Sequence, residues 1–228
     1  MLQKNLRDGF PRTDWTKRIR LVDTLALNLY TDFMSTARQF ERISVEDYLD
    51  GERLAEGKHE YVLGMVYAQA GGSNAHNLIA SNALVALAKL LPGKPCRVYN
   101  SDTKIRVRES TGTRFYYPDT MVVCRSNPPQ ESFQDEPVVV VEVISESTRR
   151  IDEGEKRDSY LSIPSLDTYI LLEQTTATAV VYQRIPNGFE QMVFVGLEAQ
   201  IPLPELKGSL LLSEIYETVD IGNIDTEG

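Results

Sequence analysis

The chain has 228 residues, of which 42% are hydrophobic and 25% are charged, and its formal net charge is -9. This length and composition predict one main α/β domain with a substantial core. No apolar run approaches the roughly 18 residues that a membrane-spanning helix needs. Leu21 to Tyr30 is interrupted by Asp23 and has no cleavage pattern, so we expect a cytoplasmic protein without a membrane anchor. The acidic balance argues against a general electrostatic grip on nucleic acid, because phosphate binding depends on lysine and arginine.

The sequence of the first part of the chain indicates an N-terminal extension followed by the start of a globular domain. Residues 1–40 are expected to form a partly helical N-terminal extension, and residues 41–228 the main domain. Ser44 precedes two acidic residues and predicts the N-cap of a short helix. Glu60 to Tyr67 then predicts a hairpin that turns at Gly64.

The rest of the chain predicts a mixed β-sheet core flanked by α-helices. The clearest helix covers residues 76–91, which carry apolar side chains at helical spacing and end before Pro92 and Gly93. Four consecutive valines within residues 138–145 predict a strand that is buried on both faces. The other expected elements are strands at 96–108, 114–124, 168–173, 178–184 and 190–195 and helices at 151–161 and 210–216.

The two cysteines lie in predicted strands. Cys96 and Cys124 do not have the CxxC spacing of a metal or redox motif, so buried thiols are expected rather than a disulfide. The sequence also contains only two histidines, which argues against a zinc site.

Two carboxylates interrupt strand-like segments. Asp119 shares its strand face with Met121 and Val123, and Glu142 shares its face with Val140 and Ile144. A charged carboxylate in apolar surroundings must be protonated, paired with a cation or bound to a metal. Two such acids in one pocket favour a metal. They would repel each other without it, so removing either is expected to raise the stability of the metal-free protein.

The order of several short segments resembles the PD-(D/E)XK nuclease superfamily and, within it, the Uma-type putative restriction endonuclease family. The resemblance covers residues 41–218 and implies a restriction endonuclease-like fold. It rests on His59-Glu60-Tyr61 with Gly64, Asn74-Ala75-His76-Asn77, Asn100-Ser101-Asp102-Thr103-Lys104, Tyr117-Pro118-Asp119, Val141 to Ser145, and Gly154-Glu155-Lys156 through Tyr160 and Ile163 to Leu166.

One position departs from the superfamily pattern. The superfamily lysine follows the second acid by two residues, where this chain has Ile144. The resemblance to Uma-type members implies that Lys156, on the following helix, supplies the ammonium instead.

The resemblance implies a DNA endonuclease that uses Mg²⁺ or Mn²⁺. Asp119 and Glu142 would be the metal ligands, and Lys156 would stabilise charge on the phosphate and help to position or deprotonate the attacking water. Glu60 would be a further ligand or would orient water. The additional candidates are Asp102 and His76, the second as a general base.

Each of these residues also has an ordinary structural interpretation. Glu60 can be a surface acid at the start of its strand, and Asp119 can act as a cap or pair with an arginine such as Arg106. Lys156 can form an exposed helix pair with Asp152, and His76 can make hydrogen bonds at a helix start.

Two basic groups could contact DNA or be ordinary solvated faces. The first comprises Lys104, Arg106, Arg108 and Arg114, and the second comprises Arg149, Arg150, Lys156 and Arg157.

Two other functions compete with that of a nuclease. A nuclease-fold protein that binds nucleic acid or a protein partner without cutting fits the acidic balance and the displaced lysine. A glycoside hydrolase would use two carboxylates without a metal, but aromatic residues are scarce near the acids. Many nucleases of this kind act as dimers, and the apolar segment from Ile201 to Leu212 is a candidate interface for a homodimer.

Overall fold

The computed structural model describes residues 42–69, 71–144 and 154–221. The chain divides into two compact units, Met1–Gln69 and Ala70–Gly228. Residues 1–40 lie outside the described residues, so the expected extension and its boundary with the main domain remain predictions.

The first unit contains the expected helix and hairpin. The helix α2 (Val45–Glu52) begins at Ser44, whose hydroxyl oxygen accepts a hydrogen bond from the Asp47 amide at 3.1 Å. The strands β1 (His59–Val62) and β2 (Met65–Ala68) pair in antiparallel register. Leu63 and Gly64 connect them with φ values of 52° and 96°, as a tight hairpin turn requires. Both sequence predictions are therefore confirmed.

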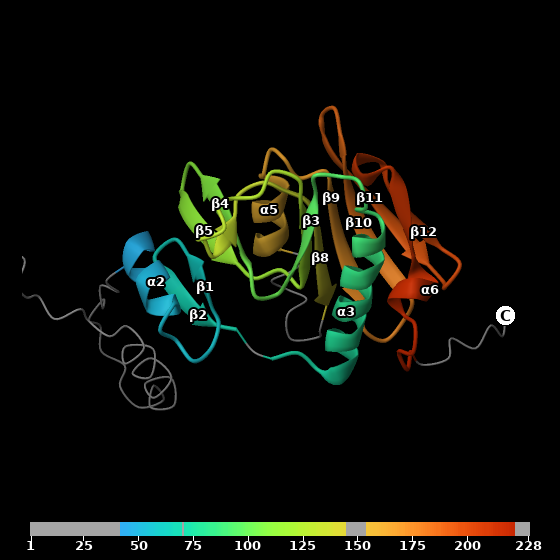
Figure 1. Cartoon of the computed structure of the whole chain (residues 1–228), viewed down its shortest axis with the longest axis horizontal. Helices are drawn as coiled ribbons and strands as arrows, with labels where there is room; N and C mark the ends of the chain where they lie inside the picture. The colour runs from blue at the N-terminus through green and yellow to red at the C-terminus, as the bar shows by residue number, and fades with distance from the viewer. Residues whose placement is uncertain (1–41, 70, 145–153, 222–228) are drawn as a thin grey trace, which may run out of the picture. The chain divides into compact units, whose positions relative to one another are not determined.

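The second unit is built on a mixed six-stranded sheet (Figure 1). Its strands, in spatial order, are β11 (Gly188–Val195), β10 (Thr178–Ile185), β9 (Thr168–Glu173), β8 (Pro137–Ile144), β6 (Thr120–Val123) and β3 (Arg97–Asn100). β8 and β9 are parallel, and the other neighbouring strands are antiparallel. The predicted mixed sheet with flanking helices is confirmed.

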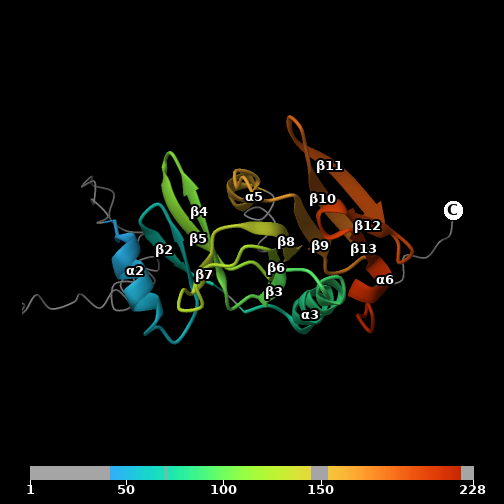
Figure 2. The ribbon, with the colours of Figure 1, turned by 45° about the horizontal axis from the view of Figure 1, so that its top comes forward.

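Helices cover both faces of this sheet. Figure 2 shows α3 (Asn74–Lys89) and α5 (Glu155–Leu161) on opposite sides of β8. The short helix α6 (Leu212–Ile215) packs beside α3. In the part of the chain that the structure describes, no helix has the length and apolar character to cross a membrane.

The alternation along β8 decides which side chains face each helix. Val139, Val141 and Val143 belong to the hydrophobic cluster that includes the buried face of α3. Side chains of neighbouring residues in a strand point to opposite faces. Glu142 therefore points away from that cluster, toward the side of the sheet that α5 covers.

Two predicted long strands are each broken in two. A turn at residues 101–103 separates β3 from β4 (Lys104–Glu109), and irregular residues 117–119 separate β5 (Gly112–Tyr116) from β6. Pro118 contributes to the second break because it has no amide hydrogen for a strand ladder. β4 pairs with β5 in antiparallel and with β7 (Phe133–Gln134) in parallel register.

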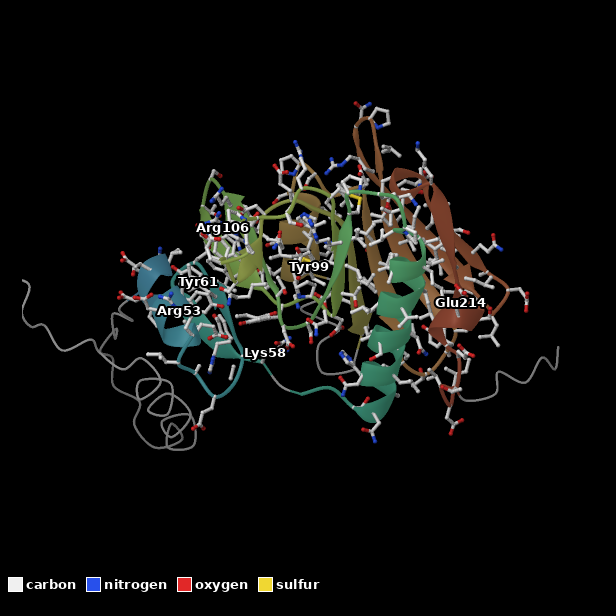
Figure 3. All side chains as sticks on the ribbon, in the orientation of Figure 1. Arg53, Lys58, Tyr61, Tyr99, Arg106 and Glu214 are labelled. Carbon is white, nitrogen blue, oxygen red and sulfur yellow. A yellow bond between two sulfur atoms is a disulfide. The ribbon has the colours of Figure 1, made fainter. Side chains whose placement is uncertain are left out.

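The expectation of free thiols is wrong, because Cys96 and Cys124 form a disulfide. Cys96 precedes β3 and Cys124 follows β6, and the adjacent residues Arg97 and Val123 are partners in the antiparallel register. The two cysteines are thus the next pair across the same two strands. Figure 3 draws the bond in yellow.

The proposed apolar interface is also corrected. Ile201 to Leu212 forms β12 (Gln200–Leu203), η1 (Pro204–Leu206), β13 (Gly208–Leu211) and the first residue of α6. Its side chains at Ile201, Leu203 and Leu210 are at most 1% exposed and belong to the core cluster. The apolar pattern of this segment therefore reflects the chain's own core and gives no support to a dimer interface.

Glu205 gives the stability of this region a dependence on pH. Burial raises the pKa of its carboxyl group, although its Oε1 accepts a hydrogen bond from the Thr168 hydroxyl at 2.8 Å. A carboxyl group whose pKa is higher in the folded state stabilises the protein below the unfolded pKa, and this contribution is lost as pH rises through the folded pKa. Glu205→Gln is therefore expected to raise the free energy of unfolding at pH 7 and to give no gain at acidic pH. Urea unfolding at both pH values measures this, and an equal gain at both would contradict it.

Candidate active site

Glu142 is the most deeply placed of the predicted acids. It lies within β8 and is only 4% exposed. Its Oε1 lies 2.9 Å from Nζ of Lys156 and accepts a hydrogen bond from the Tyr160 hydroxyl at 3.0 Å. Its Oε2 accepts a hydrogen bond from the Asp119 amide at 3.3 Å. The buried charge is thus paired and hydrogen-bonded, as its position in an apolar strand requires.

Lys156 reaches Glu142 from the first turn of α5. It is 5% exposed, so the expectation of an ordinary exposed helix pair does not describe its position. Its expected partner in that interpretation, Asp152, lies outside the described residues. Tyr160 follows Lys156 by one helical turn, and residues at this spacing share a helix face. Both side chains can therefore converge on a single oxygen of Glu142.

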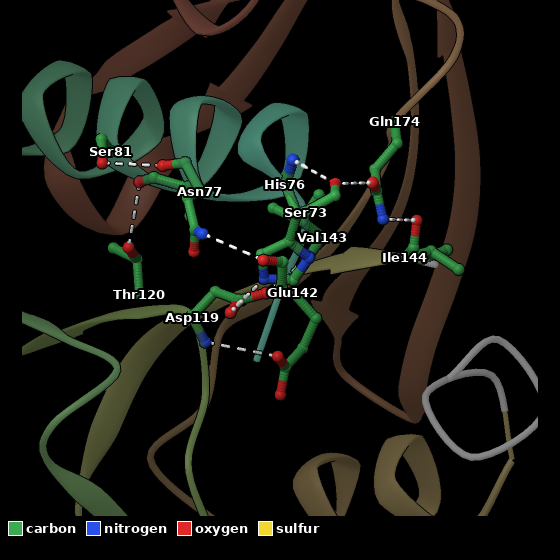
Figure 4. Close-up of polar contacts among 12 residues, drawn as sticks. Ser73, His76, Asn77, Ser81, Asp119, Thr120, Glu142, Val143, Ile144 and Gln174 are labelled. Atoms are coloured by element: carbon green, nitrogen blue, oxygen red, sulfur yellow. Dashed lines mark hydrogen bonds and ion pairs between the residues drawn. The ribbon is translucent and has the colours of Figure 1, made fainter. Parts of the chain in front are cut away.

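Asp119 lies in the irregular segment just before β6, rather than in the middle of a strand as expected. Its Oδ2 accepts a hydrogen bond from the Val143 amide at 2.7 Å, and its Oδ1 lies 2.9 Å from Nε2 of His76. Figure 4 shows Asp119 between the start of α3 and the strand that carries Glu142. The alternative interpretation of Asp119 as a partner of Arg106 is not supported among the described residues, where Arg106 instead donates two hydrogen bonds of 2.7 and 2.6 Å to Asp135.

His76 therefore belongs to this cluster. It lies in the first turn of α3, where its amide donates to the Ser73 hydroxyl at 3.1 Å. The interpretation as a helix-start residue is correct for its backbone, while its imidazole contacts Asp119. The structure brings together four predicted residues: His76, Asp119, Glu142 and Lys156.

The other two candidates are Asp102 and Glu60. Asp102 is exposed in the turn between β3 and β4, where its amide donates to the Asn100 side chain at 3.2 Å. Glu60 lies in β1 of the first unit, opposite Tyr67 in the hairpin register. Its membership of this site remains a prediction.

The two basic groups are largely engaged by neighbouring side chains. Burial raises the pKa of Asp135, but hydrogen bonds from Arg106 and Asn127 and the positive charges of Arg106 and Arg108 together lower it. Arg114 forms ion pairs with Glu109 and Glu155, and Lys104 donates to the Tyr117 hydroxyl at 3.2 Å. In the second group, Arg149 and Arg150 lie outside the described residues and Arg157 pairs with Asp158. Most of the described members therefore make contacts within the protein, and Lys104, Arg114 and Lys156 are buried rather than on solvated faces.

The donor atoms at the site are carboxylate oxygens, which are the ligands that a hard divalent cation prefers. Asp119 and Glu142 supply carboxylate oxygens, and Mg²⁺ commonly binds through one or two carboxylates while it keeps several waters. Among the described residues, no group of three or more histidine, cysteine, aspartate and glutamate side chains is arranged to hold a metal ion. A cation at this site would therefore be coordinated by the carboxylates of Asp119 and Glu142, and a third ligand from the protein remains a prediction.

Tyr160 was not among the predicted site residues, although it holds the same carboxylate oxygen as Lys156. Its signal in the sequence is its position four residues after Lys156, which places both on one face of the helix. That spacing identifies Tyr160 only when Lys156 is already assigned to the site.

Comparisons with known proteins identify a matching family and two relatives. The family Uma2, described as "Putative restriction endonuclease", matches residues 45–213. The uncharacterized protein slr1290 of Synechocystis sp. is 33% identical over 68% of this chain and 80% of its own length. The uncharacterized protein sll1609 of the same organism is 29% identical over 63% of this chain and 81% of its own.

A solved structure shows the same fold. A putative nuclease belonging to DUF820 from Anabaena variabilis superposes with a TM-score of 0.62 at 18% identity, over 76% of this chain and 97% of that chain. At this identity the likeness supports the fold alone. The match over residues 45–213 covers most of the sequence, and the chain belongs to the Uma2 family of putative restriction endonucleases.

Proposed function

We propose that this protein is a metal-dependent endonuclease that hydrolyses phosphodiester bonds in DNA. The observation that carries the proposal is the contact of Lys156 with Glu142 at 2.9 Å beside Asp119, within a family described as putative restriction endonucleases. The lysine is absent from its superfamily position at residue 144, and the ammonium of a residue on α5 reaches the second acid instead.

Asp119 and Glu142 would hold Mg²⁺ or Mn²⁺ through their carboxylate oxygens. When bound, such a cation polarises a phosphoryl oxygen and lowers the pKa of bound water. The protein's own contribution is to fix both carboxylates: the Val143 amide holds one oxygen of Asp119, and the Asp119 amide and Tyr160 hydroxyl hold Glu142. Fixed ligands need no reorganisation at the moment of reaction.

Lys156 would stabilise negative charge that develops on the scissile phosphate. A cation that is excluded from water interacts more strongly with such charge than an exposed one. Lys156 is nearly buried and its ammonium lies beside the carboxylate pair, so it has both the charge and the location for this role.

Cleavage of supercoiled plasmid tests the proposal. The wild-type protein is expected to cut with Mg²⁺ or Mn²⁺ and not with EDTA, and Asp119→Asn is expected to lose this activity. Asp158→Asn is the matched control, because this carboxylate is 69% exposed on α5 and pairs with Arg157. Equal cutting by the wild type and Asp119→Asn, or cutting that persists in EDTA, would contradict the proposal.

A second function has support from one observation. Every oxygen of the Asp119 and Glu142 carboxylates already accepts or contacts a donor from the protein. A closed network of this kind also fits a nuclease-fold protein that binds nucleic acid or a protein partner without cutting. Fluorescence anisotropy with labelled DNA in EDTA would distinguish this function, which predicts salt-dependent binding by a wild-type protein that fails to cut with any metal.

A further inference from the structure

The first turn of α3 is tied to the end of the strand that carries Glu142. The Ser73 hydroxyl accepts from the His76 amide at 3.1 Å and donates to Oε1 of Gln174 at 2.8 Å. The Gln174 side-chain amide in turn donates to the Ile144 carbonyl at 3.0 Å. Figure 4 shows this chain of contacts beside Asp119. The backbone of His76 is therefore fixed relative to β8.

The imidazole of His76 lies where a side chain at residue 72 would be. A Cβ atom built on Gly72 would lie 2.5 Å from Cδ2 and 2.8 Å from Cγ of His76, closer than real Cβ contacts allow. The same construction at Gly71 meets nothing within 4 Å. Neither glycine has a left-handed φ, so the requirement at Gly72 is for space rather than for an unusual backbone conformation.

We propose that His76 is a positioning residue that fixes the carboxylate of Asp119 as a metal ligand, and that Gly72 provides the space in which its ring lies. The proposal rests on the function proposed above. His76 acts through Asp119, and no contact of its ring with substrate is required.

The need for such a residue follows from the location of Asp119. It lies outside the regular strand, where the ladder does not fix its backbone, and among the described residues its Oδ2 accepts a hydrogen bond from the Val143 amide. The contact of Oδ1 with His76 provides a second fixed point and determines the rotation of the carboxylate. Hydrogen-bonding partners of metal ligands typically contribute about 10–100-fold to metal affinity or activity.

Calorimetric titration with Mn²⁺ tests the inference on the folded, full-length protein. Gly72→Ala is expected to weaken Mn²⁺ binding by about 10–100-fold, because it displaces the ring from Asp119. Gly71→Ala is the matched control and is expected to keep the wild-type affinity. His76→Leu should match Gly72→Ala, whereas His76→Gln should recover most of the affinity because its amide nitrogen can replace Nε2 as a donor.

A second measurement needs neither metal nor activity. The Val143 amide donates to Asp119, so its proton resonance in the metal-free protein reports the position of that carboxylate. Gly72→Ala is expected to shift this resonance and Gly71→Ala to leave it unchanged. Wild-type protein that binds no Mn²⁺ would refute the proposed function, while the shift in Gly72→Ala would still support the positioning of Asp119. Unchanged Mn²⁺ affinity and an unchanged Val143 resonance in Gly72→Ala would overturn the inference.

Discussion

Replacing Lys156 by methionine is expected to lower the free energy of unfolding by about 3–5 kcal/mol, because removing one member of a buried ion pair leaves the other charge uncompensated. The side chains of Lys156 and Glu142 are 7% and 5% exposed, and their charged atoms lie 2.9 Å apart. The Tyr160 hydroxyl and Asp119 amide would still bond to Glu142, but neither supplies a full positive charge. Urea denaturation of the metal-free protein measures the loss.

The chain contains a matched exposed pair as a control. Nζ of Lys89 lies 3.0 Å from Oε1 of Glu214, and these side chains are 59% and 41% exposed. Glu214 is labelled on α6 in Figure 3. Because water screens such a pair, Lys89→Met should cost at most about 1 kcal/mol. A loss for Lys156→Met no greater than that for Lys89→Met would contradict the buried-pair argument.

The double variant Lys156→Met/Glu142→Leu separates the pair from the packing of its side chains. Replacing both members of a buried ion pair by apolar residues is often nearly neutral or stabilising. We therefore expect the double variant to recover most of the stability that Lys156→Met loses. A double variant whose loss equals or exceeds that of the single variant would indicate that packing, rather than an uncompensated charge, is responsible.

These contacts change one expectation from the sequence. Removal of Asp119 or Glu142 was expected to stabilise the metal-free protein by relieving repulsion between two carboxylates. In the structure, Lys156 compensates Glu142, and Asp119 contacts His76 and the Val143 amide. Loss of Glu142 would leave the buried ammonium uncompensated, so we now expect destabilisation.

The sequence predicted the buried strand position of Glu142 because a strand has a simple period. A single acid among valines stands out, and the structure places it in β8 with little exposure. Lys156 became a candidate only through resemblance to a family, since nothing in its own helix distinguishes it from an exposed lysine. The fold class was accessible for the same reason as Glu142, because the apolar runs and the helix at residues 76–91 are strong local patterns.

Features that depend on where the chain reverses could not be predicted in this way. Local pattern joined residues 96–108 into one strand, and the break at 101–103 sends β3 and β4 to different sheets. Without that break, the pairing of β3 with β6 and hence the disulfide between Cys96 and Cys124 are not evident. The contact of His76 with Asp119 likewise joins residues from a helix and a strand break that are distant in sequence.

The same Lys156→Met substitution is expected to lower the rate of plasmid cleavage by about 10²–10³-fold, the typical cost of removing one electrostatic contact to a transition state. Mn²⁺ binding should stay close to that of the wild type, because the carboxylates of Asp119 and Glu142 remain. Cleavage must be measured at a temperature where circular dichroism shows the variant folded, since the substitution also removes the buried ion pair. Lys89→Met controls for the loss of one positive charge.

Cleavage at the wild-type rate by folded Lys156→Met would remove this lysine from the catalytic group. Loss of both cleavage and Mn²⁺ binding would show that its role is to support Glu142. Retained binding with lost cleavage would separate the role of the ammonium in catalysis from its role in stability, both of which depend on its position beside Glu142.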